Sequence, residues 1–136
     1  MDEAMKGAYV MSEFEKYKAE AREKWGKTAA YQEHAEKTKN YSGQKWNDLA
    51  GGMDAIMASF AACMIKGETS DSSEAQGLVK HLQDHITENY YRCTNEILFG
   101  LGQMYAADER FKKNIDRHGA GTAEYIRNAI AAYCGQ

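Results

Sequence analysis

The 136-residue sequence contains no proline. Sandwiches and barrels place both proline and glycine in their many turns, so twelve glycines without proline argue against an all-β fold. No run of about 18 apolar residues occurs, which predicts no membrane-spanning helix. The first five residues (Met1 to Met5) lack both a basic and an apolar stretch, so no signal peptide is expected. These absences favour an all-α domain in the cytoplasm.

Other absences exclude whole classes of function. Seventeen basic and 20 acidic residues give a net charge of −3, without the basic face that a free-standing nucleic-acid binder needs. Cys63, Cys93 and Cys134 form no CxxC pair and are odd in number, which fits a reducing compartment. There is no Gly-x-Ser-x-Gly elbow, and Gly100-Leu101-Gly102 is too short for a phosphate-binding loop. We therefore expect no enzyme.

Helix starts and stops divide the chain into about seven helices in one domain over residues 1–136. A Ser12–Glu15 capping box predicts the start of the first helix, which ends at Gly26. The other six helices are predicted to begin at N-cap residues: Thr28, Ser42, Ser73, Thr94, Asp108 and Thr122. The third helix carries one apolar stripe at steps of three and four: Trp46, Leu49, Met53, Ile56, Met57, Phe60 and Met64. Gly67 ends that helix, and Gly135 ends the last one. No strand is predicted.

The N-terminal third has an unusual composition. From Ser12 to Asp48 there is no Leu, Ile, Val or Met, and nearly half of the residues up to Asn40 are charged. The large apolar residues there are aromatic: Phe14, Tyr17, Trp25, Tyr31, Tyr41 and Trp46. Such a segment buries too little aliphatic surface to fold alone. Residues 1–41 are therefore either a helical hairpin packed on the core of residues 42–136 or a mobile aromatic lid that orders over a ligand.

Several polar residues have two interpretations. His81 and His85 lie four apart on one helix face and could share a metal ion or supply a haem ligand, but no third ligand is evident. We expect instead that the two histidines make polar contacts in the interior or in a cleft of the domain, or that they are ordinary surface residues. Asp108 with Arg110 fits a helix cap beside a local ion pair. No metal, haem or other cofactor is predicted.

The glycines and methionines inside helices also have two interpretations. Gly100 and Gly102 favour either a close approach of two helices or a concave wall that faces a ligand, because glycine inside a helix costs stability. Met53, Met57 and Met64 are either core filler or the wall of a pocket that accepts several shapes.

The chain resembles the TipA-S antibiotic-recognition domain over about Phe14 to Tyr133. The motifs that carry the resemblance are Ala21 to Tyr31 (AREKWGKTAAY), Lys37-Thr38 with Tyr41 and Trp46, Asn89 to Cys93 (NYYRC), Leu101 to Tyr105 (LGQMY), Asp108 to Phe111 (DERF), Asn114 to Asp116 (NID) and Gly121 to Tyr133. The resemblance implies a globin-like helical fold without haem. It also implies the effector-sensing domain of a MerR-type transcription activator, which binds bulky or thiopeptide antibiotics in a helical cleft that the N-terminal segment closes.

That resemblance, with residue type and helical face, gives a candidate set of ligand-binding residues. The set is Trp25, Tyr31, Trp46, Phe60, Met64, His85, Tyr90, Phe99, Gly100 and Tyr105. Thiopeptide binders of the family carry a cysteine that adds to the dehydroalanine tail of the antibiotic, and Gly100 stands at that position here. We therefore expect non-covalent binding of a ligand of different shape.

The resemblance also implies partners outside this chain. DNA would be contacted only through an N-terminal winged-helix domain that is absent here, and RNA polymerase only indirectly. An alternative is a stand-alone resistance protein that sequesters the drug without binding DNA. No membrane partner is expected.

Overall fold

The computed structural model describes residues 28–135, which form six α-helices and no strand. The helices are α2 (Ala29–Thr38), α3 (Gly43–Ile65), α4 (Ser73–Asn89), α5 (Asn95–Ala107), α6 (Glu109–Asp116) and α7 (Thr122–Tyr133). These helices confirm the all-α prediction. The predicted helix between Ser12 and Gly26, and with it Trp25, lies outside the described residues.

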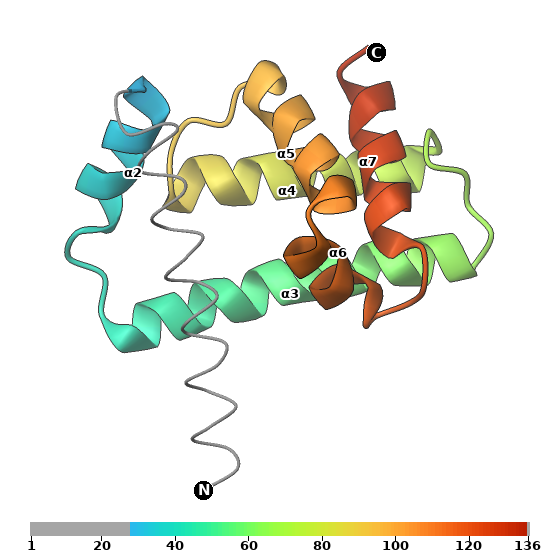
Figure 1. Ribbon diagram of the computed structural model, residues 1–136, viewed down its shortest axis with the longest axis horizontal. Helices are drawn as coiled ribbons and strands as arrows, with labels where there is room; N and C mark the ends of the chain where they lie inside the picture. The colour runs from blue at the N-terminus through green and yellow to red at the C-terminus, as the bar shows by residue number, and fades with distance from the viewer. Residues whose placement is uncertain (1–27, 136) are drawn as a thin grey trace, which may run out of the picture.

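The helices form two crossed antiparallel pairs (Figure 1). α3 and α4 lie side by side along the long axis of the molecule, and α5 and α7 cross them as a second pair. α7 is the central element, because it packs against α3, α4, α5 and α6. The largest fully buried side chains lie between these layers: Phe60, Leu82, Leu98, Ile126 and Ile130. None of the core residues described lies on α2, which is at one end of the molecule, beside the last turns of α4.

Four of the predicted helix caps are confirmed. The hydroxyl groups of Thr28, Ser42 and Thr94 each accept a hydrogen bond from the backbone N–H three residues later. Asp108 accepts from the N–H of Arg110 at 2.9 Å and pairs with its guanidinium at 2.8 Å, so this pair is structural, as predicted. The hydrogen bond from Arg110 also lowers the pKa of the Asp108 carboxyl group.

Two predicted caps are wrong by one position. Ser72, not Ser73, caps α4, with its hydroxyl accepting from the N–H of Ala75 at 3.1 Å. Thr122 is the first residue of α7, and its hydroxyl donates backwards to the carbonyl of Gly119. The cap position itself is Gly121, whose φ of 90° favours glycine. Asp116 supplies the missing acceptor for α7, at 2.8 Å from the N–H of Ala123.

α3 is long and apolar enough to cross a membrane by length and composition alone. Core helices of globular proteins pass the same test, so this is weak evidence for a membrane span. Its apolar stripe packs inside the protein, where Leu49, Ile56, Met57 and Phe60 are buried, mostly against α4 and α7. The burial of Met57 agrees with its interpretation as core filler.

The α5–α7 pair depends on a glycine. A Cβ atom on Gly102 would lie 3.1 Å from Cδ1 and 3.3 Å from Cβ of Ile130, closer than side-chain contacts normally allow. Gly102 therefore marks the close approach of two helices. Gly100, one half-turn away, is exposed and has nothing within 4 Å of a Cβ. The two glycines of the same motif thus have different surroundings.

Candidate functional site

Six aromatic and imidazole rings come from α2, the start of α3, the end of α4 and the residues next to these elements, whose backbones lie at the left of Figure 1. We call them the aromatic cluster: His34, Tyr41, Trp46, His85, Tyr90 and Tyr91. Tyr90 is its centre, with ring centroids 5.8 Å from His34, 6.2 Å from Trp46 and 6.1 Å from His85. Tyr41 meets Trp46 edge-on at 5.4 Å. These separations are those of favourable ring pairs.

Hydrogen bonds to the end of α4 hold this end of the molecule together. The Lys37 ammonium donates to the carbonyl of Thr87 at 2.9 Å, and the Tyr41 hydroxyl donates to the carbonyl of Asn89. The backbone N–H of Arg92 donates to the Glu33 carboxylate. Polar contacts and ring stacking therefore attach α2, and the described core residues all lie outside this helix.

The aromatic cluster is partly open to solvent. Trp46 is 40% exposed and is one of only two large apolar residues exposed in the described part of the chain. The Lys45 ammonium lies 5.5 Å from the centre of the Tyr41 ring, within the range of a cation–π contact. Burial raises the pKa of the Tyr90 hydroxyl, so Tyr90 presents a neutral ring. The cluster offers flat aromatic surface with polar groups at its rim.

His85 forms the inner side of the cluster. Its ring lies against Gly52 of α3, where a Cβ would come within 3.1 Å of Cε1, so glycine at position 52 makes room for the imidazole. The Nε2 atom is buried and has no hydrogen-bond partner among the described residues. Burial lowers the pKa of His85, and the charges of His81 and Lys45 act in the same direction. The charge of Glu88 and a hydrogen bond with the Leu49 backbone raise the pKa, but they do not outweigh the lowering. The imidazole is therefore neutral at pH 7.

The lowered pKa predicts a pH-dependent stability. The unfolded chain binds a proton near the ordinary pKa of 6.5, whereas the folded chain binds it only at lower pH. The free energy of unfolding is therefore expected to fall as the pH drops through 6.5 towards the folded-state pKa. Urea denaturation between pH 7.5 and 5.5 should show a smaller decline for His85→Gln than for the wild type. His81→Gln, at an exposed position, should keep most of the decline; an equal decline in all three proteins would contradict the assignment.

Comparison with known proteins identifies the family. Residues 17–133 match the model of the TipAS antibiotic-recognition domain. The chain belongs to the TipAS domain family.

The curated relatives of this TipAS domain are longer transcription regulators. The HTH-type transcriptional activator TipA of Streptomyces coelicolor is 39% identical over 118 residues, which are 87% of this chain and 47% of the relative. The HTH-type transcriptional activator mta of Bacillus subtilis is 38% identical over 118 residues, 87% of this chain and 45% of the relative. The chain therefore spans about half the length of the curated relatives it matches.

A solved relative confirms the fold of the TipAS domain. The structure of nosiheptide in complex with TipAS, from a thiopeptide antibiotic multidrug resistance system of Streptomyces lividans, matches with a TM-score of 0.81 and 38% identity. The match covers 89% of this chain and 85% of the solved one. The predicted globin-like, all-helical architecture is thus the observed one.

The TipAS fold brings only some of the predicted ligand residues together. Trp46, His85 and Tyr90 meet in the aromatic cluster, and Tyr31 lies on α2 nearby. Phe60 and Tyr105 lie in the hydrophobic core, 0% and 6% exposed. Met64 lies at the far end of α3, against the turn of Gly119 and Gly121. The role of each as a ligand contact stays a prediction.

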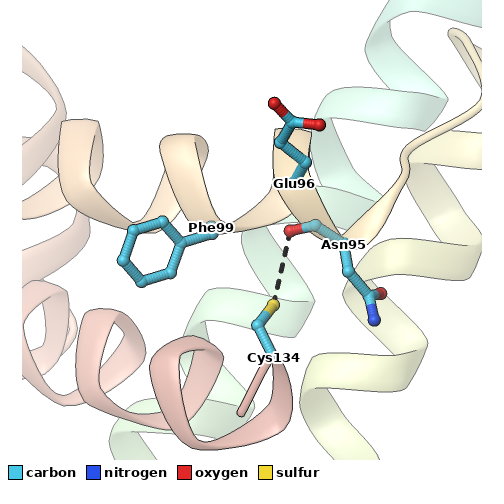
Figure 2. A pocket seen from close by; sticks show the side chains of 4 residues that line it. All are labelled: Asn95, Glu96, Phe99 and Cys134. Carbon is cyan, nitrogen blue, oxygen red and sulfur yellow. Dashed lines mark hydrogen bonds between the residues drawn. The ribbon is translucent and has the colours of Figure 1, made fainter. Parts of the chain in front are cut away.

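Phe99 belongs to a separate, open pocket of about 310 Å³ between the start of α5 and the end of α7. Figure 2 shows its lining by Asn95, Glu96, Phe99 and Cys134, with the Cys134 thiol donating to the carbonyl of Asn95 at 3.4 Å. Gly100, the next residue after Phe99, is exposed on α5. The predicted residues therefore fall at more than one place on the TipAS domain.

The thiols of the described chain are poorly suited to covalent chemistry. Cys63 and Cys93 are buried, and burial raises the pKa of Cys93 to about 11. Burial also raises the pKa of Cys134. Since the thiolate is the nucleophile, both of these thiols are protonated and weakly reactive at pH 7. Residues 28–135 likewise contain no group of three or more His, Cys, Asp or Glu side chains placed to hold a metal ion.

Three members of the aromatic cluster, His34, Tyr41 and Tyr91, were not among the predicted ligand residues. His34 stacks on Tyr90 with an angle of only 10° between the rings, and Tyr91 lies tilted beside His34. One signal was available, because His34 follows Tyr31 by three residues and shares its helix face. Tyr91 was visible only as part of the NYYRC motif.

Proposed function

We propose that this chain is the ligand-sensing domain of a MerR-type, drug-responsive transcription activator. It binds bulky aromatic or thiopeptide-like antibiotics non-covalently at the aromatic cluster. The observation that carries the proposal is the partly exposed ring surface of Trp46 and Tyr90 at the junction of α2, α3 and α4. Aromatic side chains bind flat ligands with little loss of rotamer freedom, and such surfaces suit ring-rich compounds. The nosiheptide complex of the S. lividans relative supports the ligand class.

The remaining parts of the proposal concern the larger regulator. DNA would be contacted by an N-terminal winged-helix domain and RNA polymerase indirectly, which the half-length match to HTH-type activators supports. The whole chain of residues 1–136 acts as one domain in the cytoplasm, with residues 1–41 serving as a lid over the ligand. It binds its ligand stoichiometrically and catalyses no reaction, in line with relatives that are regulators.

Tryptophan fluorescence tests the proposal directly. Trp25→Phe leaves Trp46 as the single reporter, inside the aromatic cluster. Titration with nosiheptide should change its emission in a saturable way with one ligand per chain, and isothermal calorimetry should give the same stoichiometry. No fluorescence change and no heat with nosiheptide or thiostrepton would refute the proposed function.

Binding is expected to leave both partners chemically intact. Gly100 provides no thiol, Cys63 is buried, and burial keeps Cys93 and Cys134 protonated. Mass spectrometry after incubation with thiostrepton at pH 7 should therefore give the unmodified masses of protein and antibiotic. Gly100→Cys is the matched comparison, since it places an exposed thiol on α5 with nothing within 4 Å of its Cβ. A stable adduct on the wild-type protein would contradict non-covalent binding.

A further inference from the structure

The Tyr90 ring already has a stacking partner from within the chain. Three rings from residues 28–135 lie beside it, and they meet it at different angles: 10° for His34, 33° for Trp46 and 65° for His85. Among these three, the His34 imidazole alone lies nearly parallel to the phenol ring. A parallel, offset ring at 5.8 Å is the arrangement in which a flat aromatic ligand would lie on a tyrosine face.

The two histidines of the cluster are held in different ways. His85 belongs to the long helix α4 and lies against the backbone of Gly52, so its position follows from the packing of α3 on α4. His34 belongs to α2, on which none of the described core residues lies. α2 meets the end of α4 through the Lys37–Thr87 and Glu33–Arg92 hydrogen bonds. Departure of His34 from Tyr90 would therefore leave the buried residues of α3 to α7 in place.

We propose that His34 occupies the place on Tyr90 that a planar ring of a bound ligand takes, so that His34 competes with the ligand. This inference rests on the proposed function and specifies its stacking site. The occupant is a five-membered aromatic ring, so the site accepts a ligand ring of that size. Binding exchanges one stacked ring for another, and the loss of the His34 contact reduces the net affinity.

Calorimetry with nosiheptide tests the competition. Because an aromatic pair contributes about a factor of two to ten in an equilibrium, His34→Ala should bind nosiheptide about two- to tenfold more tightly than the wild type. His34→Phe keeps a flat ring at position 34 and should bind no more tightly than the wild type. His81→Ala, at an exposed position on α4, is the matched control and should leave the affinity unchanged.

The outcomes separate this inference from the proposed function. If the wild type binds nosiheptide and His34→Ala binds equally or more weakly, His34 is not a competitor and the inference is wrong. If the wild type does not bind at all, the proposed function fails, and the inference fails with it.

Proton NMR of the wild-type protein gives a second test that needs no variant to fold well. The Tyr90 ring current shifts the ring protons of His34, which are assigned from through-bond and through-space correlations in the wild-type spectrum. Saturation with nosiheptide should abolish that shift, since the ligand takes the place of the imidazole. A shift that persists in the saturated complex would overturn the inference.

Discussion

Replacing Tyr90 with alanine is expected to weaken nosiheptide binding by about thirtyfold or more. Tyr90 is the centre of the aromatic cluster, and buried aromatic anchors at the middle of a binding surface typically contribute 2 kcal/mol or more. The change removes the stacking surface and also the contacts of Trp46 and His85 with that ring. Isothermal calorimetry on the full chain measures the loss without depending on a fluorescent reporter.

Two comparisons make the Tyr90 result specific. Tyr90→Phe keeps the ring and should retain most of the affinity, because the role of Tyr90 is stacking and its hydroxyl group carries no charge near pH 7. Phe99→Ala changes an aromatic residue in the separate pocket at the end of α7 and should have a much smaller effect. Equal losses in Tyr90→Ala and Phe99→Ala would place the ligand elsewhere than proposed.

Replacing Gly102 with valine should lower the free energy of unfolding by about 1–3 kcal/mol, the usual cost of overpacking a close contact. The added side chain would meet Ile130 of α7, whose Cβ, Cγ2 and Cδ1 atoms all lie within 3.3 Å of the new Cβ. Because the Cβ atom of Ile130 is held by the backbone, rotation of the side chain cannot relieve the contact with that atom. Urea denaturation followed by circular dichroism measures the change.

Gly100 provides the matched control on the same helix. Gly100→Val adds the same side chain where a Cβ meets nothing within 4 Å, and it also removes the conformational cost of a glycine inside a helix. This variant should be as stable as the wild type or slightly more stable. Similar losses in both variants would show that helix propensity rather than contact with Ile130 decides the stability of α5.

Local signals in the sequence predicted most of the helical framework. A cap acts within three residues of its own position, so Thr28, Ser42, Thr94 and Asp108 could be located without knowing the fold. α7 was misplaced at its start because its capping acceptor is Asp116, which lies seven residues before the N–H it binds. The buried face of α3 likewise followed from helical spacing, although Trp46 at its start proved 40% exposed.

The site could be predicted only in part, because its contacts join distant segments. His34 and Tyr90 are 56 positions apart and belong to elements with little apolar contact, so spacing along the chain carries no information about their stacking. Trp46 and Tyr90 were both expected in the site, yet their pairing depends on how α3 and α4 cross. Phe60 was expected to contact the ligand but is fully buried in the core. Helical apolar spacing does not distinguish a residue that lines a ligand pocket from one that packs in the core.

The attachment of α2 has a consequence for how such a domain can change over generations. The buried hydrophobic residues described lie between Leu49 and Ile130, and none of them belongs to α2. Under the proposed function, substitutions at the exposed positions of α2 are therefore expected to change ligand recognition at little cost in the free energy of unfolding, whereas Thr38 of the same helix is buried. Ligand preference and folding stability would then depend on different residues of the domain, so that substitutions can change the first while the second is kept.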